Sequence, residues 1–392
     1  MRQIPRAAVP FLTACTLGLA APLAAQEAHP AWEWSFHGVA LINGYFNDNK
    51  VNNTDLPTSV LAPDGVPVHL PVRSLGASVR QTRLTGMADL AGFAGGDLHT
   101  ELDVDFYGGQ LGFGRTAPLP HIRRLVAAVQ WQRWSVMAGQ EAPLVSGQNP
   151  VSLATLGIPG YTAAGNLWLW IPQVRGGYEL TMTGKVRFGL DAAALAPTAG
   201  GSQAPGIFTT PDRAEQSGRP MLEGRLRARW GQKGEIGLGG HAGWIATTGD
   251  SLLTSKAVTV DGIVPLGRSV DLRGEWFSGQ GLAMLGGGEI GQLLDAGGAP
   301  LKGSGGWGQL LVRTGTHWEL GAGYGFDLPK GTSADGANTA FKEKNEQYGG
   351  QVAWRLAPVV VAFEYRHLAT TYGGGIGERT ATHLNLAMGV EF

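Results

Sequence analysis

The feature that most constrains this chain is a repeated segment of about ten residues in which apolar and polar residues alternate. In DLHTELDVDFY (97–107), Leu98, Leu102, Val104 and Phe106 share one face, and acidic residues occupy the other. This alternation has the period of a β-strand that has one face in an apolar environment. Short turns follow some segments, and long loops rich in Gly, Pro, Asn and Ser follow the others. The pattern is typical of an antiparallel barrel that crosses a membrane.

Sixteen such segments can be recognised. They cover 32–46, 74–90, 97–107, 121–131, 133–140, 173–182, 185–195, 220–230, 234–246, 256–264, 268–277, 305–313, 316–327, 346–356, 359–368 and 379–392. Segments 74–90 and 121–131 alternate poorly, so fourteen or eighteen strands are the alternatives. We therefore predict an all-β fold: a membrane-spanning, antiparallel, up-and-down β-barrel with short periplasmic turns and long external loops.

Composition agrees with a barrel in lipid. The chain has 62 Gly among 392 residues and only 16% charged residues, against usual values of about 7% and 25%. Its net charge of −1 gives no reason to expect a nucleic-acid partner. Beyond the N-terminal segment, no apolar run reaches the roughly 20 residues of a membrane-spanning helix. An open sheet edge is excluded in hydrocarbon, because each unpaired backbone group there costs several kcal/mol.

The first 25 residues have the features of a secretory signal peptide. Arg2 and Arg6 precede an apolar stretch, and small residues lead to a predicted cleavage site after Ala25. The only cysteine, Cys15, lies in LTAC (12–15), which also matches a lipid-attached cysteine, so lipoprotein processing is the alternative. With cleavage after Ala25, residues 26–392 form the barrel and contain no thiol.

Aromatic residues are expected at both membrane interfaces. The tryptophans beside short turns are Trp131, Trp134, Trp230, Trp318 and Trp354, and those toward the long loops are Trp244, Trp276 and Trp307. The last segment ends on Phe392, which we expect to anchor the closing strand at the periplasmic side. An aromatic residue there also resembles the signal that the outer-membrane assembly machinery recognises.

The alternation places charged side chains on the inner face. The predicted basic pore-lining residues are Arg175, Arg187, Arg225, Arg227 and Arg229, and the predicted acidic ones are Glu101, Asp103 and Asp105. Two opposed ladders would create a transverse field across a pore. Because the basic set is larger, we expect a preference for anions, and guanidinium groups suit carboxylates, sulfonates and phosphates. The alternative is that these charges pair with each other and only keep the wall wet.

The long connection 141–172 is unusually apolar for an exposed loop, since it contains LWLWI. We expect it to fold into the lumen as a constriction-type loop, and packing against a neighbouring subunit is the alternative. No catalytic constellation is recognisable: the nine histidines are isolated, and no metal-ligand spacing occurs. The segment GGGEIG (286–291) is interpreted as part of an extracellular loop. We therefore predict no enzymatic activity, no cofactor and no metal.

Three stretches resemble DcaP-like porins: RQTRL (80–84), HIRRLVAAVQWQRWSVMAGQEAPL (121–144) and GNLWLWIPQVR (165–175). The matching outline within them consists of Gly139, Gln140, Gly165, Asn166, Pro172 and Gln173. The resemblance covers roughly residues 75–180. It implies a homotrimeric, sixteen-stranded porin that passes small, often anionic, organic solutes. Some members carry an N-terminal coiled coil, and this sequence enters its first strand too early to match that part.

Two functions of different classes follow. The first is an outer-membrane porin of a Gram-negative-type bacterium: a water-filled channel for passive diffusion of small hydrophilic solutes, with a preference for anionic organic ones. The second is an outer-membrane barrel with a lipid-acting enzymatic role or an adhesive role and no open pore. The expected partners are outer-membrane lipids, small solutes, further copies of the chain and the barrel assembly machinery.

Overall fold

The computed structural model describes residues 32–62, 72–109, 117–181, 184–200, 210–249 and 251–392. The predicted signal peptide, its cleavage site and Cys15 lie outside these residues. The strands are β1 (Glu33–Asn47), β2 (Ser74–Ser78), β3 (Arg83–Phe93), β4 (Gly96–Asp105), β5 (His121–Gln130), β6 (Trp134–Glu141), β7 (Ile171–Glu179), β8 (Val186–Leu195), β9 (Met221–Trp230), β10 (Gly234–Ala246), β11 (Leu252–Pro265), β12 (Val270–Gln280), β13 (Lys302–Thr314), β14 (Trp318–Lys330), β15 (Lys342–Leu356), β16 (Val359–Tyr372) and β17 (Gly377–Glu391).

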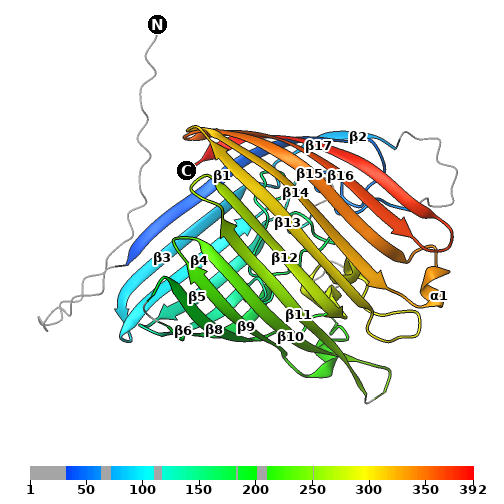
Figure 1. Ribbon diagram of the computed structural model, residues 1–392, viewed down its shortest axis with the longest axis horizontal. Helices are drawn as coiled ribbons and strands as arrows, with labels where there is room; N and C mark the ends of the chain where they lie inside the picture. Colours follow the sequence, from blue (N-terminus) through cyan, green and yellow to red (C-terminus); the bar gives the residue numbers. More distant parts are fainter. Residues whose placement is uncertain (1–31, 63–71, 110–116, 182–183, 201–209, 250) are drawn as a thin grey trace, which may run out of the picture. The chain divides into compact units, whose positions relative to one another are not determined.

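The strands form one closed antiparallel sheet (Figure 1). From β3 onward each strand pairs with the next along the chain, and β1 pairs with β17 from Val39↔Glu391 to Asn47↔His383. The segments β2 and β3 pair with two successive parts of the same edge of β1, so together they make one interrupted barrel strand. The barrel is therefore sixteen-stranded, as the alternation predicted. Within the described ranges, helical structure is confined to short turns, including η3 (Leu282–Leu285), η4 (Gly288–Gly291) and α1 (Ser333–Gly336).

The two poorly alternating segments are irregular for identifiable reasons. The second barrel strand breaks at 79–82, where Arg80 and Gln81 are buried. A register shift between β4 and β5 pairs Asp103 with Arg124 and Val104 with Ile122. Arg123 is the extra residue of this bulge, so it and Arg124 both reach acidic side chains of β4.

The outward face is apolar and solvent-accessible, as expected for a surface in lipid. On β9, Leu222 and Leu226 are exposed and alternate with buried Glu223 and Arg225. No helix among the described residues is long and apolar enough to cross a membrane. Trp134 and Trp318 are exposed on the outside at the short-turn ends of β6 and β14, in agreement with the aromatic prediction, and Trp276 is exposed further along β12.

The placement of Trp307 in the external aromatic band was wrong. Trp307 is 5% exposed, and its ring stacks on Tyr161 at a centroid distance of 5.9 Å. Its neighbours Gly306 and Gly308 alternate with it on the outside of β13. Trp307 therefore faces the interior and packs against the long connection between β6 and β7.

Replacing Leu226 by Arg tests the outward face of β9. We expect Leu226→Arg to lower the free energy of unfolding by about 2–4 kcal/mol, because it exposes a guanidinium to hydrocarbon. Denaturant unfolding of the protein folded into lipid vesicles measures this. Leu266→Arg is the matched control, since Leu266 is exposed in the short turn between β11 and β12. Equal loss in both variants would contradict the assigned face.

Candidate functional site

The connection between β6 and β7, residues 142–170, is packed inside the barrel. Its backbone and side chains form hydrogen bonds with inward-facing residues from strands far apart around the wall. These partners are Asn43 on β1, Glu223 on β9, Glu275 on β12, Gln309 on β13, Gln347 on β15 and Glu364 on β16. The loop therefore spans the lumen, and its LWLWI stretch is largely buried, with Leu167 and Ile171 at most 1% exposed.

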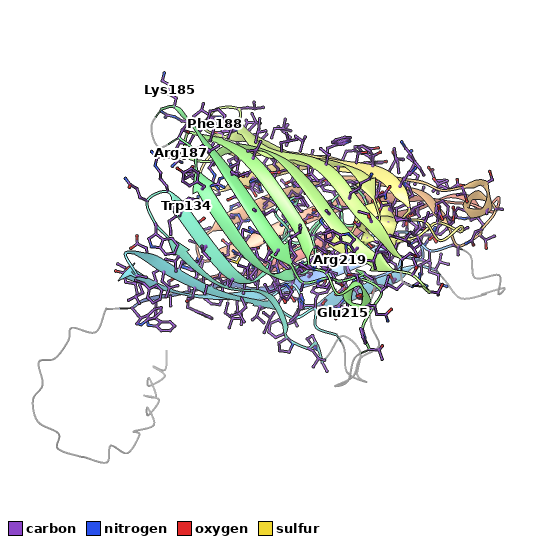
Figure 2. All side chains as sticks on the ribbon, turned by 90° about the horizontal axis from the view of Figure 1, so that it is seen from below. Trp134, Lys185, Arg187, Phe188, Glu215 and Arg219 are labelled. Atoms are coloured by element: carbon purple, nitrogen blue, oxygen red, sulfur yellow. The ribbon has the colours of Figure 1, made fainter. Side chains whose placement is uncertain are left out.

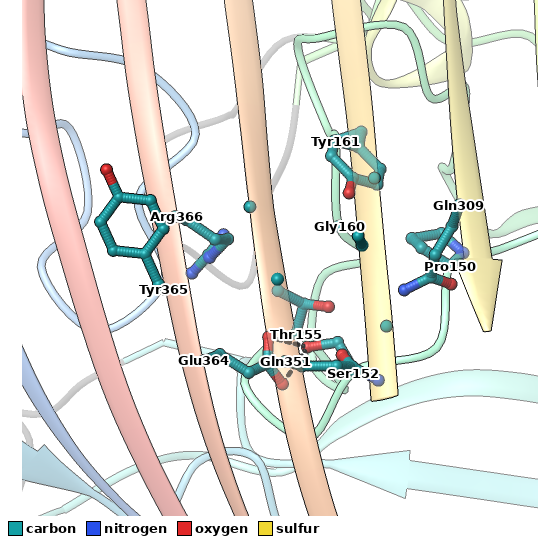
Figure 3. A pocket seen from close by; sticks show the side chains of 15 residues that line it. Pro150, Ser152, Thr155, Gly160, Tyr161, Gln309, Gln351, Glu364, Tyr365 and Arg366 are labelled. Carbon is teal, nitrogen blue, oxygen red and sulfur yellow. Dashed lines mark hydrogen bonds between the residues drawn. The ribbon is translucent and has the colours of Figure 1, made fainter. Parts of the chain in front are cut away.

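Three buried carboxylates hold this inserted loop. Glu364 accepts hydrogen bonds from the Ser152 hydroxyl at 2.8 Å (Figure 3). It also accepts from the backbone N–H groups of Leu153 and Ala154 at 2.9 and 3.0 Å. On the other side of the lumen, Glu223 accepts from the backbone N–H of Leu144 at 2.6 Å. Buried polar groups are stable when they are hydrogen-bonded, so these contacts satisfy groups of both the wall and the loop.

Glu275 holds the same loop between these two contacts. Its carboxylate accepts from the Ser146 hydroxyl at 2.9 Å. The interruption at 79–82 adds a fourth attachment, since Gln81 donates to the Ala154 carbonyl at 2.8 Å and accepts from the Gly157 N–H at 2.7 Å. The break in the second barrel strand thus exchanges sheet pairing for contacts with the inserted loop.

Glycines in the loop and in the wall allow the two to approach closely. Gly165 has φ +101°, and a Cβ there would lie 2.2 Å from the Gly306 carbonyl oxygen. On β14, a Cβ at Gly323 would lie 2.2 Å from the Tyr161 hydroxyl oxygen, and one at Gly325 would lie 2.3 Å from the Ala164 carbonyl oxygen. Part of the high glycine content therefore serves close approach of one backbone to another.

Between the loop and the wall lies a cavity of about 460 Å³. Its charged lining residues are the basic Arg83, Arg123, Arg124, Arg273 and Arg355 and the acidic Glu141 and Glu391. Arg273 donates to the Asn149 carbonyl of the loop at 3.2 Å. The Arg123 guanidinium lies over the Trp170 ring, 4.5 Å from its centroid. Arg124 pairs with Glu141 and Arg355 pairs with Glu391, so Arg273 is the lining guanidinium that forms no ion pair within the described ranges.

The predicted acidic ladder lies behind these arginines. Asp103 and Asp105 are fully buried and Glu101 is 8% exposed. Arg83 reaches Asp103 at 2.6 Å, and Arg124 reaches Glu101 at 2.6 Å. The carboxylates therefore do not form an open acidic wall opposite the basic one, because cross-strand arginines cover them.

The predicted arginine ladder on β9 points inward and is paired with acids of neighbouring strands. Arg225 contacts Asp261 at 2.5 Å and Glu235 at 2.6 Å. Arg227 contacts Asp191 and Glu179, and Arg229 contacts Glu235 and, at 3.8 Å, Glu179. Other strands of the wall therefore supply four carboxylates for these three guanidiniums.

The other two predicted basic residues have different surroundings. Arg175 donates to the Ala142 carbonyl at 2.7 Å and to Gln173 at 2.8 Å, so it supports the start of the inserted loop. Arg187 is exposed at the short-turn end of β8, close to Lys185, whereas Glu215 and Arg219 lie at the opposite end (Figure 2). None of the five residues lines the cavity between the loop and the wall.

Sequence reasoning missed the residues that do line this cavity on its basic side. Arg83, Arg123 and Arg124 occur within the stretches that carry the DcaP-like resemblance, which was the available signal. Strict alternation would send one member of the Arg123–Arg124 pair outward, and only the bulge brings both to acidic partners on β4. No group of three or more His, Cys, Asp or Glu side chains that could hold a metal occurs within the described ranges.

A second segment also packs into the lumen, which the interpretation of 286–291 as an extracellular loop did not anticipate. Leu282, Met284, Leu285 and Ile290 are at most 3% exposed. The first three belong to one apolar cluster with Leu144, Val145 and Leu167 of the inserted loop and with Ile245 and Phe277 of the wall. Residues 281–294 and 142–170 therefore support each other.

Glu289 is the titratable residue within this second segment. It is fully buried, and its carboxylate accepts from the Leu282 N–H at 2.6 Å. Burial raises the pKa of Glu289 to about 8, while hydrogen bonds from the Leu282 and Ala283 backbones act in the opposite direction. The neighbouring carboxyl group is Asp327 on β14, which accepts from the Ile290 N–H at 3.2 Å.

Comparison with protein-family models and with curated proteins gives no match. Solved structures do match: the outer membrane channel DcaP of Acinetobacter baumannii has a TM-score of 0.71 at 16% identity, covering 92% of this chain and 97% of that one. This chain has the porin fold. Salmonella typhi OmpF in complex with daunomycin has a TM-score of 0.53 at 9% identity, covering 92% of this chain and 97% of that one. The trimer form of Vibrio cholerae OmpT has a TM-score of 0.53 at 13% identity, covering 92% of this chain and 100% of that one.

Replacing Gly165 by Ala tests how the loop is seated. We expect Gly165→Ala to displace residues 142–170, because the positive φ alone costs about 1–3 kcal/mol for a non-glycine residue and the Cβ would overlap Gly306. Limited proteolysis of the folded barrel should then cleave within the loop. Gly176→Ala is the control, because a Cβ there meets nothing within 4 Å. An equally protected loop in both variants would contradict the seating described.

The packing of 281–294 should depend on pH through Glu289. Because its pKa in the packed segment is raised from 4.5 to about 8, the packed state holds more protons. Protonation of Glu289 therefore stabilises the packed segment. This stabilisation is complete below about pH 4.5 and is lost as pH rises through about 8. Amide hydrogen exchange of 281–294 should accelerate, beyond its intrinsic pH dependence, between pH 6 and pH 9. Glu289→Gln should remove that acceleration, and its persistence in the variant would assign it to another group.

Proposed function

We propose that this chain is a porin of the outer membrane of a Gram-negative-type bacterium. In this proposal, small hydrophilic solutes diffuse passively through a water-filled lumen whose width is set by residues 142–170. The apolar outward face, the aromatic residues near both strand ends and the porin fold support this location. The matched structures include channels and porins by description, although at 16% identity and below they indicate fold alone.

We propose further that the channel prefers anionic organic solutes. The observation that carries this preference is Arg273, a guanidinium that lines the cavity and forms no ion pair within the described ranges, whereas the other four lining arginines are paired with carboxylates. A guanidinium can donate two parallel hydrogen bonds to a carboxylate, a sulfonate or a phosphate. The predicted ladder Arg225, Arg227 and Arg229 would contribute less than expected, because its charge is balanced locally.

The alternative function is a barrel without an open pore, with an enzymatic or adhesive role. One observation favours a closed lumen: the apolar cluster formed by residues 281–294 and 142–170 fills part of the interior. The absence of enzymatic activity stays a prediction. Homotrimer formation also stays a proposal, supported by the match to a trimer form of OmpT. Recognition of Phe392 by assembly machinery is a proposal of the same kind.

The decisive experiment is a reversal-potential measurement in a KCl gradient across a planar bilayer. We expect conductance with a permeability ratio that favours chloride over potassium. Arg273→Gln should lower this ratio about twofold to fivefold, because one unit charge about 4 Å from a permeating ion in water contributes on the order of 1 kcal/mol. Arg273 is suitable because it forms no ion pair with any described residue.

Lys256→Gln is the matched control, since it removes one positive charge from the outward face and should leave the ratio unchanged. No conductance in any preparation would refute the pore and favour the alternative function. Conductance with cation selectivity would refute the role of the arginines and leave the pore intact.

A further inference from the structure

A second, smaller cavity lies between the inserted loop and the wall formed by β13–β16 (Figure 3). Its volume is about 30 Å³, close to the roughly 30 Å³ that one water molecule takes up in the liquid. The loop residues that line it include Ser152, Thr155 and Tyr161, and the wall residues include Gln351 and Arg366. The space is therefore too small for an organic solute and suits one water molecule or one monatomic ion.

Two glycines of the wall leave this space open. Inward positions of β13–β17 form one cross-strand row, Gln309–Gly323–Gly349–Arg366–His383. In its middle, Gly323 and Gly349 have no side chain to fill the gap beneath the loop. The Tyr161 hydroxyl oxygen lies 2.2 Å from the place that a Cβ of Gly323 would occupy. The gap is therefore bounded by a hydroxyl on the loop side and by Arg366 at its edge.

Arg366 is a buried guanidinium that forms no ion pair within the described ranges. It is 8% exposed. Its side chain extends from β16 toward β15, where a Cβ of Gly349 would lie 3.1 Å from the Arg366 Cγ (Figure 3). Nη1 donates to the Pro57 carbonyl at 3.4 Å, and Nε and Nη2 have no hydrogen-bond partner. Buried charges and buried donors without partners are unfavourable, so this group indicates a site for an ion or a water molecule.

The titratable groups beside Arg366 do not balance its charge. Glu364, two residues earlier on the same face, directs its carboxylate to the hydroxyl and backbone N–H groups of residues 152–154. On the other side, His383 uses Nδ1 for a contact with Asn47 at 2.8 Å and carries no negative charge. The described residues therefore place no carboxylate in direct contact with this guanidinium.

Neutral donors complete the lining of the small cavity. The Thr155 hydroxyl is buried and has no hydrogen-bond partner. The Tyr161 hydroxyl and the Gln351 amide also line the cavity and form no hydrogen bond with any described residue. Hydroxyl, amide and guanidinium groups can all donate to one anion, whereas a cation would be repelled by Arg366. The lining therefore favours an anion.

We propose that this cavity binds one monovalent inorganic anion of the halide class between Arg366 and the inserted loop. The guanidinium supplies the charge, the hydroxyls of Thr155 and Tyr161 donate hydrogen bonds, and the bound ion joins the loop to β16. Because Pro150, Ser152 and Thr155 also line the larger cavity, occupancy of the small site fixes one side of the route proposed for solutes. The inference goes beyond the porin function and does not depend on conduction, since this ion is held in place.

The first test locates the ion in the unmodified protein. Crystals of the full-length barrel are soaked in sodium bromide, and anomalous diffraction at the bromine absorption edge identifies bromide. We expect an anomalous peak beside the Arg366 guanidinium, between Gly349 and the Tyr161 hydroxyl. Density without an anomalous signal would assign the space to water, and the absence of density would show that nothing binds. Either result overturns the proposal.

The second test measures how the anion holds the loop in solution. Amide hydrogen exchange of residues 150–161 in the full-length barrel is compared in sodium bromide and in sodium gluconate at equal ionic strength, because gluconate is too large for the cavity. An ion that binds only the seated loop slows exchange roughly tenfold when its concentration is about ten times its Kd. We expect this slowing in bromide, and equal exchange in the two salts would overturn the proposal.

Two variants assign the slowing to the site. Arg366→Gln removes the guanidinium and should abolish the difference between bromide and gluconate. Arg379→Gln is the matched control, because Arg379 shares the inward parity of His383 on β17, is half-buried and lies outside the cavity. A difference that persists in Arg366→Gln, or that disappears equally in both variants, would contradict the site. The two measurements on the unmodified protein need no variant to fold.

The result can be separated from the result for the porin proposal. A barrel that conducts ions but holds no bromide at Arg366 refutes the anion site and leaves the porin proposal unaffected. Bromide at Arg366 in a barrel without conductance supports the anion site and refutes the pore.

Discussion

Pairing of every strand edge is the constraint on which the rest of this structure depends. Lipid offers no hydrogen-bond partner, so the edges of β1 and β17 must join. Their pairing closes sixteen strands around an interior too wide for the side chains of the wall to fill. The polar inner face that results must then be satisfied by water, by other side chains or by inserted backbone.

In this protein, inserted backbone supplies much of that satisfaction. Glu223, Glu275 and Glu364 are buried carboxylates that accept hydrogen bonds from residues 142–170. Other acids pair with guanidiniums across strands, as Asp261 does with Arg225. Most lumen charges therefore hold the architecture together. The arginines that remain beside open space, such as Arg273, are the residues on which an anion preference would depend.

The sequence predicted the barrel well because the relevant signal is local. Leu226 points outward and its sequence neighbour Arg225 points inward, and this alternation continues wherever a strand is regular. The prediction of inward and outward residues was less accurate where a bulge or an interruption breaks the regular alternation of a strand. A bulge brings both Arg123 and Arg124 to acids of β4, and an interruption at 79–82 makes Gln81 a contact of the inserted loop. Trp307 was misplaced because alternation alone does not say which face of a glycine-rich strand is buried.

The sequence by itself determined the fold class, favoured sixteen strands over fourteen or eighteen, and assigned the lipid-facing residues of the regular strands and the asymmetry between short and long connections. These properties follow from a two-residue period and from turn composition, both of which are local. Only the tertiary structure decided which charges are neutralised and which face a cavity. Arg225 and Asp261 lie 36 residues apart, and Glu364 lies 211 residues from Leu153. Such partners are set by strand register and by loop insertion, which depend on the closed barrel as a whole.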